Sequence, residues 1–268
     1  MSTIALNTAS TGLNALSTSL DVTANNLANV NTTGFKSSRT NFEDLFYLTR
    51  AQPGIENEFG NAQPNGLQVG LGVKASGTSL NLTQGSFETT GDAFDLAIQG
   101  DGWFQIELPD GISSDDHGYT RAGDFTRNQS GEWVMANSGG YRLEPNFPIP
   151  EDATQVTVSE QGVVNYVVDG QTEEAGQITL ARFINPAGLK AIGGNIYVPT
   201  EGSGEPEIGE PNENGFGSIL QGNLEMSNAQ PVTELVTLIK TQRAFEMNSQ
   251  VIQAANETLQ EVVNLRRF

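Results

Sequence analysis

The sequence predicts an α+β protein. Coiled-coil-like helices at the N- and C-termini are expected to pair with each other, and the chain between them is expected to form a central, mostly antiparallel β domain. Three observations lead to this prediction. Leucines recur every seven residues near the N-terminus, and apolar residues recur every seven residues near the C-terminus. Between them, short alternating runs such as EWVMA and GQITLARF are separated by turn signals such as PDG and VDG.

The N-terminal helix is expected to run to Gly34, where glycine provides a stop. Its apolar seam is predicted to consist of Leu6, Leu13, Leu16, Leu20, Leu27 and Val30. Asp21 is the only charged residue in the first 35 residues, whereas a solvated helix normally carries many charges on its outer face. We therefore favour helices that become ordered when neighbouring copies bury them. The alternative is an ordinary intramolecular helical hairpin.

The C-terminal helix is expected to begin at Pro231, because proline fits the first turn of a helix. Its seam is predicted to consist of Leu238, Phe245, Ile252 and Leu259. Together with the N-terminal helix it forms the predicted terminal helical domain, residues 1–34 and 228–268.

The remaining residues divide into two regions by their pattern of apolar, polar and turn-forming residues. Residues 81–204 are expected to form the β domain, and residues 35–80 and 205–227 an irregular or extended connecting region. Within this region, the prolines and glycines of residues 46–66 exclude a continuous helix and leave little apolar surface for a core of its own.

Composition excludes several classes of function. The net charge is −19, with 32 acidic against 13 basic residues, so nucleic acids and anionic membrane surfaces are not expected partners. The absence of cysteine excludes disulfides and thiolate chemistry. No run of residues has the pattern of a secretory signal peptide or the length of a membrane span, so no membrane insertion is expected.

A catalytic constellation is not expected either. His117 is the only histidine, and a polar loop is a simpler interpretation of DDHGY than a metal site. The run VGLGVKA lacks the helix that a dinucleotide motif needs after it. Asp92 and Asp95 fit turns and strand ends better than a glycosidase pair. We therefore expect no enzymatic activity, no cofactor and no metal.

One run resembles a known signature. LDVTANNLANVNTTGFKSSR is similar to the N-terminal signature of the bacterial flagellar rod and hook proteins, and its matching residues are Asn25, Asn26, Leu27, Asn29, Gly34 and Phe35. The resemblance extends through GLQVGLGVKA and DLAIQGDGWFQIELPDG to LQGNLEMSNAQPVTELVTLIKTQRAFEMNSQ, so that it covers the chain essentially from end to end.

The resemblance implies a structural subunit of the distal rod, which self-assembles into a straight, hollow helical drive shaft and transmits torque from motor to hook. It implies export by the flagellar type III apparatus to the basal body, between periplasm and outer membrane. The implied partners are further copies of the chain, the proximal rod, the hook and the surrounding ring proteins. It also implies that residues 46–66 are a rod-type extension that stiffens the lattice.

Two kinds of alternative stay open. Within the same family, the chain could be a proximal rod or hook-type axial protein. In a different class, it could be a secreted β-rich glycan-binding module or enzyme that uses Trp103 and nearby acids.

Overall fold

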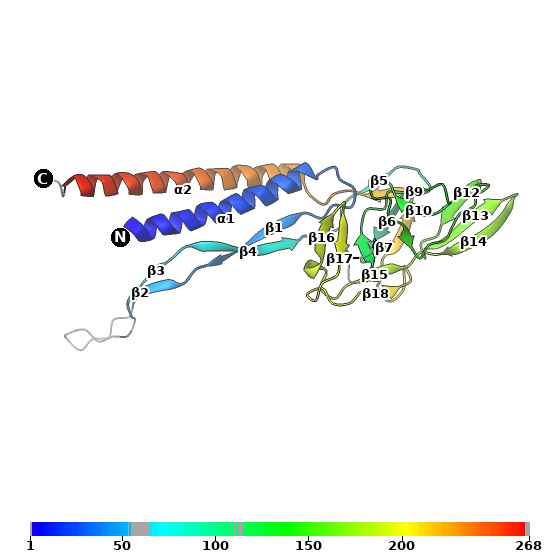
Figure 1. Ribbon diagram of the computed structural model, residues 1–268, viewed down its shortest axis with the longest axis horizontal. Coiled ribbons are helices and arrows are strands. Elements are labelled where there is room, and N and C mark those ends of the chain that lie inside the picture. Colours follow the sequence, from blue (N-terminus) through cyan, green and yellow to red (C-terminus); the bar gives the residue numbers. More distant parts are fainter. Residues whose placement is uncertain (1, 53, 55–64, 110, 112–114, 266–268) are drawn as a thin grey trace. The chain divides into compact units, whose positions relative to one another are not determined.

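The structure is a computed structural model, and it describes residues 2–52, 54, 65–109, 111 and 115–265 of the chain. The chain divides into two compact units. We call the first the helical unit, and it comprises Met1–Leu27, Ser38–Ser79 and Pro231–Phe268. We call the second the β unit, and it comprises Ala28–Ser37 and Leu80–Gln230. The antiparallel β domain flanked by terminal helices is confirmed (Figure 1).

The helical unit contains two long helices and a β ribbon among its described residues. The helices are α1 (Ser2–Ala28) and α2 (Pro231–Leu265), which lie side by side and antiparallel (Figure 1). The ribbon consists of β1 (Ser38–Asp44), β2 (Tyr47–Ala51), β3 (Leu67–Gly70) and β4 (Val73–Leu80). β1 pairs with β4, and β2 pairs antiparallel with β3.

Helix α1 ends six residues earlier than the glycine predicted to stop it. It ends at Ala28, and the chain then passes through turns to Gly34. Asn29 accepts hydrogen bonds there, from the Thr32 N–H through its backbone carbonyl (3.2 Å) and from the Thr32 hydroxyl through its side chain (3.1 Å). Such local bonds compete with helical hydrogen bonds, so Asn and Thr end the helix before the glycine does. Helix α2 begins at Pro231, as predicted.

The β unit is built on a sheet with the strand order β16-β17-β8-β7-β15-β18, in which β11 also pairs with β7. These pairings are antiparallel. The strands are β7 (Trp103–Glu107), β8 (His117–Thr120), β11 (Leu143–Glu144), β15 (Leu180–Arg182), β16 (Lys190–Gly193), β17 (Ile196–Val198) and β18 (Glu207–Gly209). A 3-10 turn, Pro186–Gly188, precedes β16.

Smaller antiparallel elements surround this sheet. A sheet with the order β12-β13-β14 consists of β12 (Gln155–Val158), β13 (Val163–Val168) and β14 (Gln171–Gln177). Strand pairs are formed by β5 (Phe87–Thr89) with β20 (Asn223–Glu225), by β6 (Leu96–Gln99) with β19 (Ser218–Gln221), and by β9 (Phe125–Arg127) with β10 (Trp133–Met135).

The expected connecting region has more order than the sequence indicated. Its first part, residues 35–80, contains the ribbon strands β1 to β4. Its second part, residues 205–227, contains β18, β19 and β20 and belongs to the β unit. The ribbon strands are difficult to recognise because they lack a buried face: all of β2 except Ala51 is exposed, so no alternation marks it in the sequence.

The two units differ sharply in their cores. The β unit buries a cluster around Phe104, Phe125 and Trp133, where the Phe104 and Phe125 rings meet edge to face with centroids 5.4 Å apart. A second cluster surrounds Trp103, whose ring lies 5.0 Å from that of Tyr197. Among the described residues of the helical unit, the fully buried apolar side chains are those of Ala9 and Ala15.

We expect Gly34→Ala to destabilise the β unit strongly. Gly34 has φ +68°, and a Cβ there would lie 2.4 Å from the backbone nitrogen of Ala122. The left-handed conformation and the backbone clash together cost about 3 kcal/mol or more of unfolding free energy. The matched control is Gly91→Ala, since Gly91 also has positive φ (+77°) but has nothing within 4 Å of an added Cβ.

The control isolates the cost of the backbone conformation, which is about 1–2 kcal/mol. Denaturant unfolding followed by tryptophan fluorescence measures both variants, because Trp103 and Trp133 lie in the cores of the β unit. Equal losses in Gly34→Ala and Gly91→Ala would contradict the close approach to Ala122.

Candidate functional site

The predicted seam of α2 lies on the less exposed side of the helix. Leu238, Phe245, Ile252 and Leu259 are half-buried. The same side also carries Thr241, which is buried, and Asn248, which is half-buried, so the period of seven is regular. Apolar side chains on the rest of α2, such as Ile239 and Val251, are about half exposed (48% and 49%).

The large residues of the predicted α1 seam are covered less completely than small residues of the same helix. Leu6, Leu13, Leu16, Leu20, Leu27 and Val30 are half-buried. The fully buried positions are those of Ala9, Gly12, Ala15, Thr23 and Asn26. A Cβ on Gly12 would lie 3.2 Å from the Asn248 side-chain nitrogen, so the two helices approach closely where glycine leaves room.

The helical unit exposes large apolar side chains on α2 and on the ribbon. The large exposed side chains on α2 are Val232, Leu235, Val236, Ile239, Met247, Val251 and Val263. Those on and beside the ribbon strands are Phe42, Phe46, Tyr47, Leu48, Leu67 and Leu71. Phe46 is 88% exposed. A soluble monomer rarely exposes apolar surface on this scale, so these side chains mark an interaction surface.

A groove of about 400 Å³ lies within the same unit. It is lined by side chains of α1, α2 and the ribbon, namely Ile4, Ala5, Thr8, Ala9, Arg50, Val69, Gly70, Asn248 and Val251. Most of this lining is apolar or small, and it carries no pair of groups that could transfer a proton or attack a substrate. The groove therefore fits packing better than catalysis.

The signature residues guide the chain out of α1. The Asn26 amide group donates to the Ser38 carbonyl (2.8 Å) and accepts from the Ser38 N–H (2.9 Å), so it binds the start of β1 as a neighbouring strand would. Gly34 donates its N–H to the carbonyl of Glu225 (2.7 Å), and the carbonyl of Phe35 accepts from Asn228 (3.3 Å). Asn25 is exposed. Asn26 thus fixes the start of β1 within the helical unit, and backbone hydrogen bonds hold Gly34 and Phe35 within the β unit.

A buried ion cluster follows the signature directly. The Lys36 ammonium lies 2.6 Å from Oε1 of Glu225 and donates to the Thr83 carbonyl (3.0 Å). Glu225 also accepts from the Gly85 N–H (3.0 Å) and lies 3.3 Å from Nη1 of Arg121. The exposed fractions of the Lys36, Glu225 and Arg121 side chains are 2%, 0% and 7%.

Burial dominates the electrostatics of this cluster. Desolvation lowers the pKa of Lys36, and the attraction of Glu225 opposes that shift. The pKa of Arg121 is lowered in the same way, with Glu225 and then Asp101 opposing. Sequence reasoning missed the cluster. The available signal was that Lys36 is the first basic residue of the chain and follows a long neutral run.

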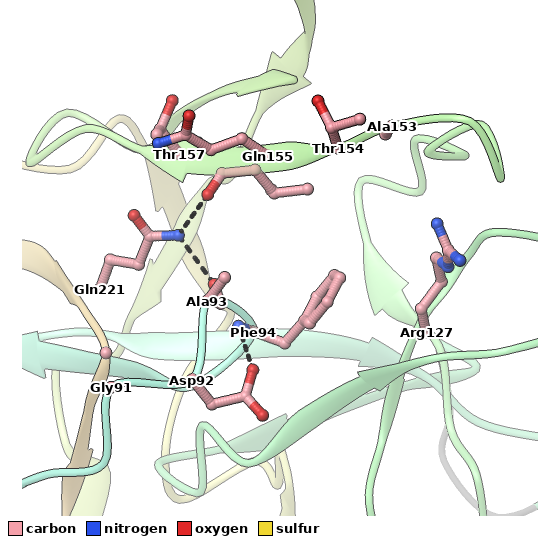
Figure 2. A pocket seen from close by; sticks show the side chains of 12 residues that line it. Gly91, Asp92, Ala93, Phe94, Arg127, Ala153, Thr154, Gln155, Thr157 and Gln221 are labelled. Atoms are coloured by element: carbon pink, nitrogen blue, oxygen red, sulfur yellow. Dashed lines mark hydrogen bonds between the residues drawn. The ribbon is translucent and has the colours of Figure 1, made fainter. Parts of the chain in front are cut away.

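A cavity of about 560 Å³ in the β unit is shown in Figure 2. The Gln221 amide donates to the carbonyls of Ala93 (2.8 Å) and Val156 (3.0 Å), and it accepts from the Val158 N–H (3.0 Å). Among the described residues that line this cavity, the ionisable ones are Asp92 and Arg127. The described lining of this cavity thus contains one carboxylate, that of Asp92, rather than the pair that hydrolyses a glycoside.

The other two residues considered for catalysis or sugar binding, Trp103 and His117, contact neighbouring side chains of the β unit. Trp103 is 4% exposed and packs against Tyr197, so it cannot offer a platform to a sugar. His117 lies with Nδ1 2.7 Å from the Glu144 carboxylate. The described residues contain no group of three or more His, Cys, Asp or Glu side chains placed to hold a metal ion. Neither described helix is long and apolar enough to cross a membrane.

Comparison with known protein families gives three matches along the chain. Residues 6–36 match the family described as flagella basal body rod protein. Residues 97–166 match the flagellar hook protein FlgE/F/G D1 domain, and residues 220–265 match the flagellar basal body rod FlgEFG protein C-terminal family.

Curated relatives align over nearly the whole chain. The flagellar basal-body rod protein FlgG of Caulobacter vibrioides is 43% identical over 265 residues, which cover 98% of this chain and 99% of the relative. FlgG of Borreliella burgdorferi is 44% identical over 267 residues, or 98% of each chain. The rod protein FlgF of Caulobacter vibrioides is more distant, at 33% identity over 85% of this chain and 83% of the relative.

We expect Glu225→Gln to lower the unfolding free energy of the β unit by about 3–5 kcal/mol, because it leaves the buried cations Lys36 and Arg121 without their anion. The matched control is Glu207→Gln, which removes the partner of Arg182 in an exposed pair (2.7 Å) and costs under about 1 kcal/mol. Denaturant unfolding measures both variants. Similar values for the buried and the exposed pair would show that the cluster is not required for stability.

Proposed function

Because the chain belongs to the family of flagellar basal-body rod proteins named FlgG, we propose that copies of it polymerise through the apolar side chains that its helical unit exposes. The chain is a structural subunit of the distal rod in the flagellar basal body. The polymer that we propose is a straight, hollow helical shaft, and its mechanical role is to transmit torque from the motor to the hook.

One observation carries this proposal. The helical unit buries only two apolar side chains fully among its described residues, those of Ala9 and Ala15, and it exposes large apolar ones over α2 and the ribbon. Burying a large apolar side chain contributes about 1.5–3 kcal/mol, so covering several of them with neighbouring copies stabilises an assembly substantially. A repeated contact between unlike surfaces generates an open helical polymer when successive rotations do not close into a ring.

The same surfaces account for contacts with other axial proteins. Membership of the rod family implies assembly with other rod, hook and basal-body proteins. We propose that the proximal rod and the hook continue the same helical packing at the two ends of the shaft, and that ring proteins surround it. Export by the flagellar type III apparatus belongs to this proposal as well.

We also propose that the protein has no catalytic role and needs no cofactor. Two facts support this. The ionisable side chains that line the β-unit cavity of about 560 Å³ are Asp92 and Arg127, and Trp103 is buried. The glycan-binding alternative is therefore not favoured, because Trp103 is 4% exposed.

The rod-type extension near residues 46–66 remains a proposal. Strands β2 and β3 lie at its two ends and pair antiparallel, with Tyr47 opposite Gly70 and Leu48 opposite Val69. Residues 53 and 55–64 lie outside the described residues. We propose that this extension bridges neighbouring rows of subunits, because a bending tube needs rows that slide and a bridge removes that freedom.

Adding charge to the exposed apolar face of α2 is expected to stop polymerisation while the monomer still folds. In the double variant Val236→Asp and Val251→Asp, both carboxylates are solvated in the monomer, since these side chains are 44% and 49% exposed. In a polymer they would be buried without partners, at a cost of several kcal/mol per subunit. Electron microscopy and sedimentation of concentrated protein measure the outcome.

The control places the same charges on neighbouring exposed polar positions, Thr237→Asp and Gln250→Asp. This control is expected to polymerise as the parent does. Normal tubes from the Val236→Asp and Val251→Asp protein would refute assembly through the apolar face of α2.

Deleting residues 50–64 is expected to leave polymerisation intact, because α1 and α2 remain, but to give curved or flexible tubes. Cryo-electron microscopy of the deletion polymer measures its curvature against that of the parent. Tubes as straight as the parent would refute the bridging role. Loss of polymerisation would place the segment in the main lattice contact instead.

A further inference from the structure

Helices α1 and α2 approach each other closely where Gly12 faces Asn248. Gly12 is buried, and it is the only glycine of α1. A Cβ added to Gly12 would lie 3.2 Å from Nδ2 of Asn248, which is closer than ordinary van der Waals contact. Ala9 and Ala15, about one turn to either side of Gly12, are buried as well. Small residues on α1 thus leave room for the longer side chain of Asn248.

Asn248 interrupts the apolar seam of α2 with a polar side chain. It lies between the seam residues Phe245 and Ile252 and is half-buried, as they are. It also lines the groove of about 400 Å³, together with Ile4 and Ala9 of α1. A polar amide in an apolar seam costs stability, and in coiled coils a single asparagine of this kind selects one alignment of the helices over the others.

Other alignments of the two helices would place a larger residue opposite Asn248. A slide by seven residues keeps the heptads matched, and it replaces Gly12 at this place by Ala5 or Ser19. Both of these residues have a Cβ where Gly12 leaves space. Because a Cβ at this distance is already too close, Asn248 would have to move outward or the helices would have to separate.

We propose that Gly12 and Asn248 set the register of the antiparallel pair formed by α1 and α2. We call these two residues the register contact. The heptads alone leave the register open, because a slide by one heptad, about 10 Å along the axis, again matches seam with seam. The register contact removes this ambiguity, since α1 offers a single glycine to the asparagine of α2.

The register decides which surface the helical unit presents. Exposed apolar side chains such as Val236 and Val251 occupy fixed positions along α2. A slide by one heptad would displace them by about 10 Å relative to α1. Copies with different registers would therefore present different surfaces, whereas a repeated contact between copies needs the same surface on each.

A distance measurement between two spin labels in the unassembled full-length protein tests the proposal, so the result does not depend on polymerisation. The chain has no cysteine, so Ser17→Cys and Gln253→Cys, both at exposed positions, direct one label to each helix. Dilution with unlabelled protein restricts the measured distances to labels within one molecule. The labelled parent is expected to give one narrow distance distribution. A broad distribution in the parent would show that the pair has no fixed register and would overturn the proposal.

In this labelled protein, Asn248→Leu is expected to broaden the distribution or to add a second distance, because leucine fits an apolar seam in more than one register. The two distances would differ by up to about 10 Å, the length of one heptad. The matched control is Asn256→Leu, the same substitution at an exposed position of α2, and it is expected to keep the narrow distribution. A narrow distribution in Asn248→Leu, or equal broadening in both variants, would overturn the proposal.

Far-UV circular dichroism separates a loss of register from a loss of helix. Asn248→Leu replaces an amide of the seam by an apolar side chain, so the helix content is expected to stay the same or to increase. Asn248→Ala removes the amide without adding bulk, and it is expected to broaden the distance distribution in the same way. Loss of helix in both variants would show that Asn248 stabilises the helices instead of aligning them, and it would overturn the proposal.

Discussion

The ion pair between Lys36 and Glu225 joins residues that are 189 positions apart in the chain and brings their charged atoms within 2.6 Å. Lys36 stands where the chain leaves the signature, and Glu225 ends the last strand before α2. Glu225 additionally accepts the Gly85 N–H through its side chain and the Gly34 N–H through its carbonyl. These contacts close the β unit, in that they hold together the segments at which the chain enters and leaves it. Removing either partner of such a buried pair is strongly destabilising.

Asn228 reinforces that closure through neutral hydrogen bonds. Its side-chain amide donates to the carbonyls of Asn81 (2.7 Å) and Thr83 (2.9 Å), and its oxygen accepts from the Ser37 N–H (2.8 Å). One side chain thus ties together three segments that meet beside the ion cluster. Among the described residues, the β unit has large buried apolar clusters and a buried ion pair, whereas the helical unit fully buries only the apolar side chains of Ala9 and Ala15. Stability is therefore concentrated in the β unit, whereas most of the large exposed apolar side chains among the described residues belong to the helical unit.

The fold could be predicted from the sequence where apolar residues recur at a regular spacing. Heptads revealed both terminal helices, and Pro231 marked the start of α2. The end of α1 was predicted at Gly34 because a glycine is easily recognised, whereas Asn29 and its neighbours stop the helix through bonds that no spacing reveals. Strand β2 was missed because an exposed strand lacks alternation. The Lys36–Glu225 pair has no sequence pattern at all, since its members are remote and only the tertiary fold brings them together.

The amide of Gln221 has a consequence for one edge strand of the β unit. Strand β12 lies at the edge of its sheet, and an open edge invites strands of other molecules to pair with it and form aggregates. Gln221 binds the Val156 carbonyl and the Val158 N–H, the backbone groups of β12 that such a strand would use. Gln221 therefore shields this edge of the sheet from pairing with a strand of another molecule at Val156 and Val158, whereas β14 forms the other edge of the sheet.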